Sequence, residues 1–118
     1  MRPAVRLLGL AVLLALGLSL RPAAAAELEI VNGSTKAIEH VYLARKNQRK
    51  WGPDRLDGQD AITPGATRIV AGIDPTAYDV RLSDDADREC ELYSVVITST
   101  RRLELTDGML EECTRESH

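Results

Sequence analysis

The two cysteines of this chain, Cys90 and Cys113, predict a covalent bond. In a chain exported to an oxidising compartment, an even cysteine count favours a disulfide over a metal site or a reactive thiol. A bond between them closes a loop of 23 residues. On the chain-entropy view, closing such a loop should stabilise a small domain by about 3 kcal/mol.

An acidic stretch is the best candidate for binding a metal. Its carboxylates alternate around an expected turn: Asp84, Asp85, Asp87 and Glu89. Oxygen ligands of this kind suit a hard cation such as calcium, but the stretch is not an EF-hand. Counting from Asp85 puts Cys90 at the invariant glycine and Val96 at the bidentate glutamate. A solvated turn is the simpler interpretation, so we assign no metal or other cofactor, and calcium bound by the three aspartates remains an alternative.

Residues for catalysis are scarce. His40 and His118 are the only histidines, and the motifs of serine hydrolases, zinc proteases and phosphate-binding loops are absent. We interpret His40 as a structural residue on a strand and expect no enzymatic activity. A small hydrolase that uses scattered carboxylates, such as Asp54 with Asp79, is the alternative.

The loop that holds the only tryptophan contains the candidate binding residues, Trp51 and Asp54. The indole could close one end of the core or offer a platform for a sugar or a peptide. Asp54 could cap the following turn or act as a polar partner beside that platform. Just before them lies a basic cluster, which we interpret first as a solvated turn: Arg45, Lys46, Arg49 and Lys50.

The first 26 residues have the three parts of a secretory signal peptide. Arg2 and Arg6 give a positive start, residues 7–18 are apolar, and four alanines end the segment. The apolar run is shorter than the roughly 20 residues that span a membrane, and it fits the core of a signal peptide. We therefore expect cleavage after Ala26 and one mature domain, residues 27–118, in the periplasm or the medium of a bacterium. An uncleaved anchor is the alternative.

The mature sequence alternates apolar and polar residues with a period of two, and no window of a dozen residues has helical periodicity. The expected strands cover residues 28–31, 37–44, 67–73, 78–82, 91–98 and 102–106. Residues 50–65 are dense in turn formers and predict a long loop. Loops of that length in small domains are often functional.

We expect these strands to form an all-β fold, an antiparallel β-sandwich of immunoglobulin-like or related type with six or seven strands. A small open barrel is the alternative. The first two strands should pair as a hairpin, and so should the last two, with Ile97 facing Leu103. Gly108 then frees a tail in which Cys113 folds back onto Cys90.

Five short motifs are spaced along the mature chain. They are Val31-Asn32-Gly33, Trp51-Gly52-Pro53-Asp54-Arg55-Leu56, Pro64-Gly65, Tyr78-Asp79-Val80-Arg81 and Asp84-Asp85-Ala86-Asp87. Together they resemble the pattern of small secreted bacterial proteins of unknown function. The resemblance implies a β-sandwich without an established activity. That group often has a cysteine where this chain has Ala77, so its disulfides are not carried over.

Charge narrows the class of partner. The signal peptide takes three of the 15 basic residues and none of the 18 acidic ones, which leaves a formal charge of −6. Nucleic acids and anionic membranes need a basic face, so neither is expected as a partner. We expect a non-enzymatic module that binds a protein or a cell-envelope component through the region from Trp51 to Asp60. A calcium-dependent module and a carboxylate hydrolase are the alternatives.

Overall fold

The computed structural model describes residues 24–116, which form six strands and one helix. The elements are β1 (Ala26–Asn32), β2 (Ile38–Arg45), β3 (Thr67–Ile73), β4 (Thr76–Asp84), β5 (Glu89–Ile97), β6 (Thr100–Leu105) and α2 (Asp107–Glu116). The predicted signal peptide lies almost wholly outside the described residues. Ala26, the expected last residue of that peptide, is buried and begins β1, so the predicted cut falls within the first strand.

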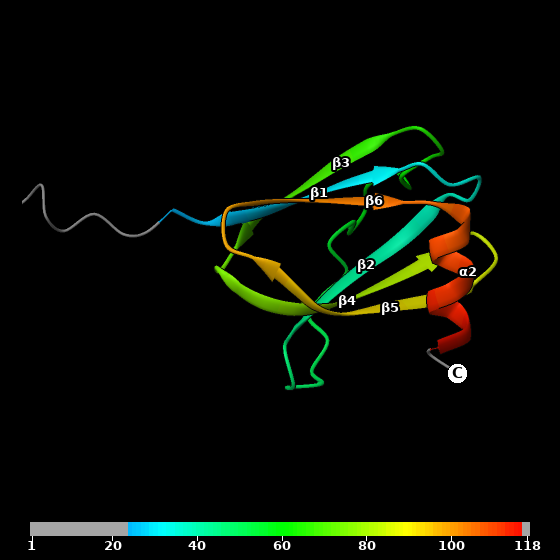
Figure 1. The fold of residues 1–118 in the computed structure, drawn as a ribbon. Helices are drawn as coiled ribbons and strands as arrows, with labels where there is room; N and C mark the ends of the chain where they lie inside the picture. Colours follow the sequence, from blue (N-terminus) through cyan, green and yellow to red (C-terminus); the bar gives the residue numbers. More distant parts are fainter. Residues whose placement is uncertain (1–23, 117–118) are drawn as a thin grey trace, which may run out of the picture.

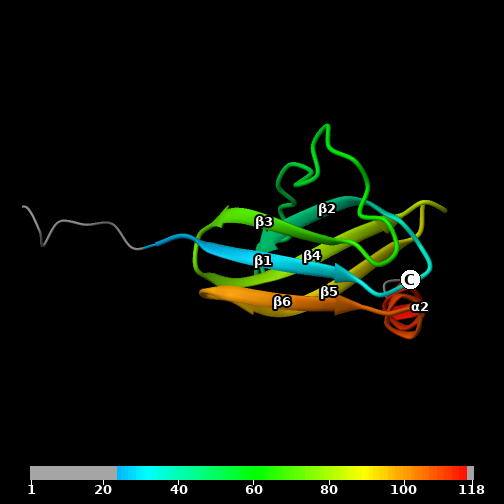
Figure 2. The same ribbon diagram turned by 90° about the horizontal axis from the view of Figure 1, so that it is seen from above.

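The strands form two three-stranded sheets. One has the order β3-β1-β6 and is called here the β1 sheet; the other has the order β2-β4-β5 and is called the β4 sheet. The two lie in separate layers, as two views of the ribbon show (Figures 1 and 2). The prediction of an all-β fold is confirmed. One pairing departs from the expected antiparallel pattern, because β1 runs parallel to β6.

The core lies between the sheets because each strand points every second side chain inward. In β1, Leu28 and Ile30 are fully buried, while Glu27, Glu29 and Val31 beside them are half-buried. In β4, Val80 and Leu82 are also buried and enter the core from the opposite layer. Both sets belong to one apolar cluster. Burial of such side chains stabilises the fold by roughly 1.5–3 kcal/mol each.

Both predicted hairpins are wrong. β1 and β2 lie in different sheets, and so do β5 and β6. Ile97 and Leu103 are both buried in the one core, which they enter from opposite layers. An alternating pattern predicts which side chains point inward, but two strands that face each other across a core have the same pattern as two strands in a hairpin.

The turn after β1 shows how the chain changes sheets. The buried Asn32 side chain donates hydrogen bonds to the carbonyl oxygens of Lys36 and Ile62, at 2.7 and 2.8 Å, and its oxygen accepts one from the Ser34 hydroxyl. Gly33 lies against the end of β6, where an added Cβ would be 2.9 Å from the Leu105 carbonyl oxygen. Only glycine fits so close an approach without a shift of the backbone.

The expected C-terminal tail is a helix, so this prediction is also wrong. The Thr106 hydroxyl accepts a hydrogen bond from the Met109 amide at 3.2 Å, which satisfies one of the free donors at the start of α2. Leu110 and Cys113, three residues apart, are both buried. A ten-residue helix with such a narrow apolar face is too short to show in a twelve-residue window.

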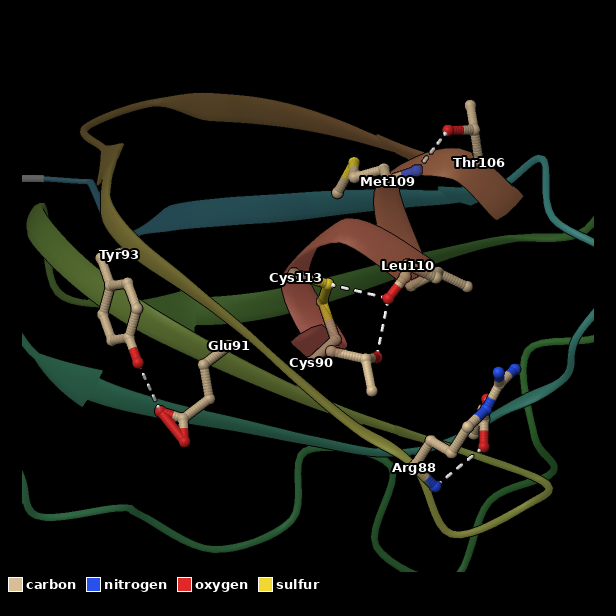
Figure 3. Close-up of a disulfide and its surroundings, with 10 residues drawn as sticks. Arg88, Cys90, Glu91, Tyr93, Thr106, Met109, Leu110 and Cys113 are labelled. Carbon is tan, nitrogen blue, oxygen red and sulfur yellow. Dashed lines mark hydrogen bonds and ion pairs between the residues drawn. A yellow bond between two sulfur atoms is a disulfide. The ribbon is translucent and has the colours of Figure 1, made fainter. Parts of the chain in front are cut away.

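The predicted disulfide is confirmed. Cys90 of β5 is bonded to Cys113 of α2, with the Cα atoms 5.1 Å apart. Figure 3 shows the bond below Leu110, on the side of α2 that faces the sheets. Since α2 follows directly from β6, the bond ties the end of the β1 sheet to the edge of the β4 sheet.

The expected long loop connects β2 to β3 and stands out from the sheets in both views (Figures 1 and 2). Its first part runs along the free edge of β2. The amides of Gly52 and Arg55 donate to the carbonyl oxygens of Leu43 and Val41, at 3.0 and 2.7 Å. A single antiparallel β-bridge between Ile38 of β2 and Ile62 of the loop covers a further part of this edge. The loop therefore protects this edge from pairing with another chain.

Candidate functional site

The outer face of the β4 sheet gathers most of the aromatic side chains. The whole sequence has one tryptophan, three tyrosines and no phenylalanine. Tyr78 points into the core. Tyr42 and Tyr93 also lie on strands of the β4 sheet, but their side chains are on the solvent side of that sheet. Trp51 joins them from the loop. Tyr93 is 59% exposed, which is high for a large apolar side chain.

Arg81 is the centre of this face. Its guanidinium carbon lies 4.4 Å from the centre of the Trp51 ring, within the range of a cation–π contact. Its Nη2 atom is 3.2 Å from a carboxylate oxygen of Glu91, and Glu89 lies 3.7 Å from its Nε atom. Only the contact with Glu91 is a hydrogen bond, and the Nε atom is buried without a hydrogen-bond partner. Glu91 therefore holds the guanidinium, and the guanidinium in turn covers one face of the indole.

Glu91 extends this arrangement to Tyr93. The tyrosine hydroxyl donates to the second carboxylate oxygen of Glu91 at 3.0 Å, and Figure 3 shows the two side chains meeting beside β5. This hydrogen bond raises the pKa of Tyr93 above 10.0, because loss of the proton would place two negative charges together. The phenol is therefore held as a neutral donor.

A surface depression of about 430 Å³ lies over these residues. Its lining combines aromatic and charged side chains: Asn47, Arg49, Trp51, Asp79, Arg81, Glu91 and Tyr93. Its volume is within the usual range of small-molecule sites, about 300–1,000 Å³. The two arginines and two acidic residues balance in formal charge, so this depression has no strong preference for the sign of a ligand.

Asp54 fastens the loop to the sheet rather than lining the depression. One of its carboxylate oxygens accepts the amides of Val41 and Leu56, at 3.1 and 3.0 Å, and the other lies 2.7 Å from Nδ1 of His40. The Leu56 bond is the turn cap that the sequence suggested. Partial burial raises the pKa of Asp54, but the bonds from His40 and the two amides outweigh it, so the pKa is lowered from 3.8.

His40 is the other half of this clamp. Its side chain is 47% exposed, and the hydrogen bond to Asp54 raises its pKa above 6.5. The imidazole ring also stacks on Tyr42, with centroids 6.1 Å apart. In the described residues no hydroxyl or thiol is hydrogen-bonded to the ring, so the pair lacks the nucleophile of a catalytic triad.

The acidic turn from Asp84 to Glu89 connects β4 to β5. Burial raises the pKa of Asp84, but the amides of Arg88 and Ala86 and the Arg88 guanidinium hydrogen-bond to its carboxylate and lower the pKa below 3.8. These bonds occupy the lone pairs that a cation would use. Over residues 24–114, no group of three or more His, Cys, Asp or Glu side chains is placed to hold a metal ion. Asp85 and Asp87 are therefore not part of any such group.

Of the two binding candidates named from the sequence, Trp51 lines the depression and Asp54 does not. The sequence analysis did not name Arg81, Glu91 or Tyr93. The signal for Arg81 was present, because the alternation in β4 placed it on the solvent side. Tyr93 was harder to find. Ser94 has a φ of 58° and the β4–β5 register shifts nearby, so a simple alternation along β5 does not give the side on which each residue lies.

Comparison with protein-family models, with curated proteins and with solved structures finds no match to this chain. Over the described residues, no helix has the length and apolar character needed to cross a membrane. The function therefore has to be argued from the site itself.

Proposed function

We propose that this protein is a non-enzymatic binding module of the bacterial periplasm or medium, and that it binds a protein or cell-envelope component through the outer face of the β4 sheet. The observation that carries this proposal is the placement of Tyr42, Trp51 and Tyr93 on one face. Aromatic residues and arginine are enriched where proteins bind partners. A chain with so few aromatics would gain stability from burying them.

The order of the face supports the same proposal. Trp51 and Tyr93 are each fixed by a partner, Arg81 and Glu91 respectively. A site whose side chains are already positioned loses little conformational entropy on binding. The proposed architecture is an immunoglobulin-like or related β-sandwich, in which the two layers form a rigid support. Membership of the group of small secreted bacterial proteins described above is part of this proposal.

Two exposed apolar residues on opposite sheets allow a matched test. Tyr93 is 59% exposed on the β4 sheet and Ile69 is 45% exposed on the β1 sheet. We would immobilise the exported protein, its Tyr93→Ser variant and its Ile69→Ser variant, and compare capture of components from envelope extracts of the host. Tyr93→Ser should lose the captured component, and Ile69→Ser should retain it.

Equal capture by all three proteins, or equal loss in both variants, would show that the β4 face is not the binding surface. Thermal unfolding of each variant checks that the fold is intact. Protease or glycosidase treatment of the captured material distinguishes a protein partner from a glycan.

A further inference from the structure

A second hollow is also lined by Trp51. It has a volume of about 320 Å³ and includes the ends of β2 and β3 and the start of β4. The residues that matter for its chemistry are Arg45, Lys50, Trp51, Arg55, Asp74 and Tyr78. Three of them are cations and one is an acid, so the hollow has a formal charge of +2.

The cations of this hollow are mostly unpaired. Arg45 donates to the Asp74 carboxylate at 2.8 Å, which compensates the one negative charge. Lys50 and Arg55 have no ion pair within the described part of the chain, unlike Arg81, Arg88 and Arg102. In a mature domain with a formal charge of −6, unpaired positive charge in one hollow indicates an anionic ligand.

Arg55 gives a second indication. Its Nε atom is shielded from solvent and has no hydrogen-bond partner in the described chain, as is also true of Arg81 Nε in the neighbouring depression. A buried donor without a partner is destabilising, so a ligand toward which the Arg55 side chain turns, and which accepts this hydrogen bond, recovers that cost. The guanidinium presents paired donors that match a carboxylate or a phosphate.

The surroundings favour a sugar over a peptide. On the edge of β2 beside the hollow, backbone carbonyl groups already accept hydrogen bonds from the amides of Gly52 and Arg55. An acidic peptide therefore cannot add to this edge as a further strand. The volume is near the lower end for small-molecule sites and suits one compact unit. The indole of Trp51 offers an apolar surface on which the C–H face of a pyranose can pack.

We propose that this hollow binds an acidic sugar unit of an envelope polysaccharide, with the sugar acid on Lys50 and Arg55 and the ring against Trp51. This inference rests on the proposed function and narrows it, since it names the class of envelope component. The neighbouring depression would then accommodate the next unit of the chain.

Trp51 is the only tryptophan, so its emission reports on the two hollows that it lines. We would titrate the exported protein with galacturonate oligomers and, as a control, with uncharged galactose oligomers of equal length. A saturable change with the acidic oligomer, weakened by salt, is expected. Lys50→Gln and Arg55→Gln should each lower the affinity by about tenfold.

Lys46→Gln is the matched control, because it removes the same charge from the same loop but lines neither depression. It should change the affinity by less than about threefold. Lys50 is exposed, so its variant keeps the test valid if Arg55→Gln does not fold.

Three results would overturn the acidic-sugar inference. They are no response to the acidic oligomer at millimolar concentration, an equal response to the uncharged one, and equally tight binding of a hexaglutamate peptide or of phosphatidylglycerol vesicles. If galacturonate fails while envelope capture still depends on Tyr93, the proposed function stands and only this inference falls. If capture fails as well, both fall.

Discussion

The two sheets expose outer faces of different chemistry. On the β1 sheet, Arg102 lies 2.8 Å from a carboxylate oxygen of Glu29 and 2.9 Å from one of Glu104. These charges satisfy one another across neighbouring strands and leave little for a partner to gain. On the β4 sheet, the charges instead hold aromatic rings in place, as Arg81 holds Trp51. Charged side chains therefore pair with one another on one face, and on the other they position the aromatic side chains of the surface that we propose for binding.

The largest expected effect comes from the disulfide, which is attached to the β4 sheet through β5. Cys90→Ala combined with Cys113→Ala should lower the free energy of unfolding by about 3 kcal/mol, because the unfolded chain regains the entropy of the open loop. Urea unfolding measures the loss. Adding reductant should destabilise the native protein and leave the double variant unchanged. A loss below about 1 kcal/mol would mean that the packing of α2 suffices without the bond.

The clamp at Asp54 should have the next largest effect. Asp54→Ala leaves the amides of Val41 and Leu56 without their acceptor and should cost about 1–2 kcal/mol in the free energy of unfolding. Asp57→Ala, an exposed acid in the same loop, serves as the control and should cost less than about 0.5 kcal/mol. Equal effects in urea unfolding would show that the loop is not held through Asp54.

A matched pair of arginines tests the comparison of the faces directly. Arg81→Ala removes the cation from the indole and leaves Glu91, whose side chain is only 19% exposed, without that partner. It should lower the free energy of unfolding by about 1 kcal/mol or more and alter the emission of Trp51. Arg102→Ala, on the other face, should leave both measurements unchanged. If the two variants behave alike, the faces do not differ in the way argued above.

The smallest effect is the pH dependence of the His40–Asp54 pair. The raised pKa of His40 means that its contribution to stability is fully present below 6.5 and is lost as the pH rises through the raised value. The lowered pKa of Asp54 means that its contribution is present above 3.8 and is lost as the pH falls through the lowered value. His40 and Asp54 are therefore both charged only at a pH between these two pKa values.

His40→Gln isolates the histidine's share. The stability of the native protein relative to this variant should shrink between about pH 5.5 and about pH 8.5. Unfolding curves at the two pH values give the difference. A relative stability that grows towards high pH would contradict the assigned bond.

The sequence predicted the strands well and their partners poorly. The alternation in β4 predicts its buried residues, because a period of two depends only on which side faces the core. The pairing of β1 with β6 depends on contacts between distant parts of the chain, which no local pattern contains. The helix was missed because, in its part up to Thr114, only Leu110 and Cys113 are buried.

In the candidate site, too, local features were predictable from the sequence and contacts between distant residues were not. Trp51 and Asp54 were identifiable because a single tryptophan in a turn-rich loop is unusual. The placement of Tyr42 and Tyr93 on the same face as Trp51 depends on strand register and on the irregularity at Ser94, and both are properties of the sheet rather than of any segment. The unpaired state of Arg55 is visible only once the neighbours of each cation are known.

The position of β1 has a consequence for how the chain folds. β1 is the middle strand of its sheet, between β3 and β6, and 73 positions separate Glu27 from Thr100, to which it is hydrogen-bonded. The strand made first by the ribosome therefore stays unpaired on one side until nearly the whole domain is available. Contacts so distant along the chain slow folding, so the polypeptide should remain open for longer than a chain of the same length with mostly local contacts. Slow closure would suit the export that we propose.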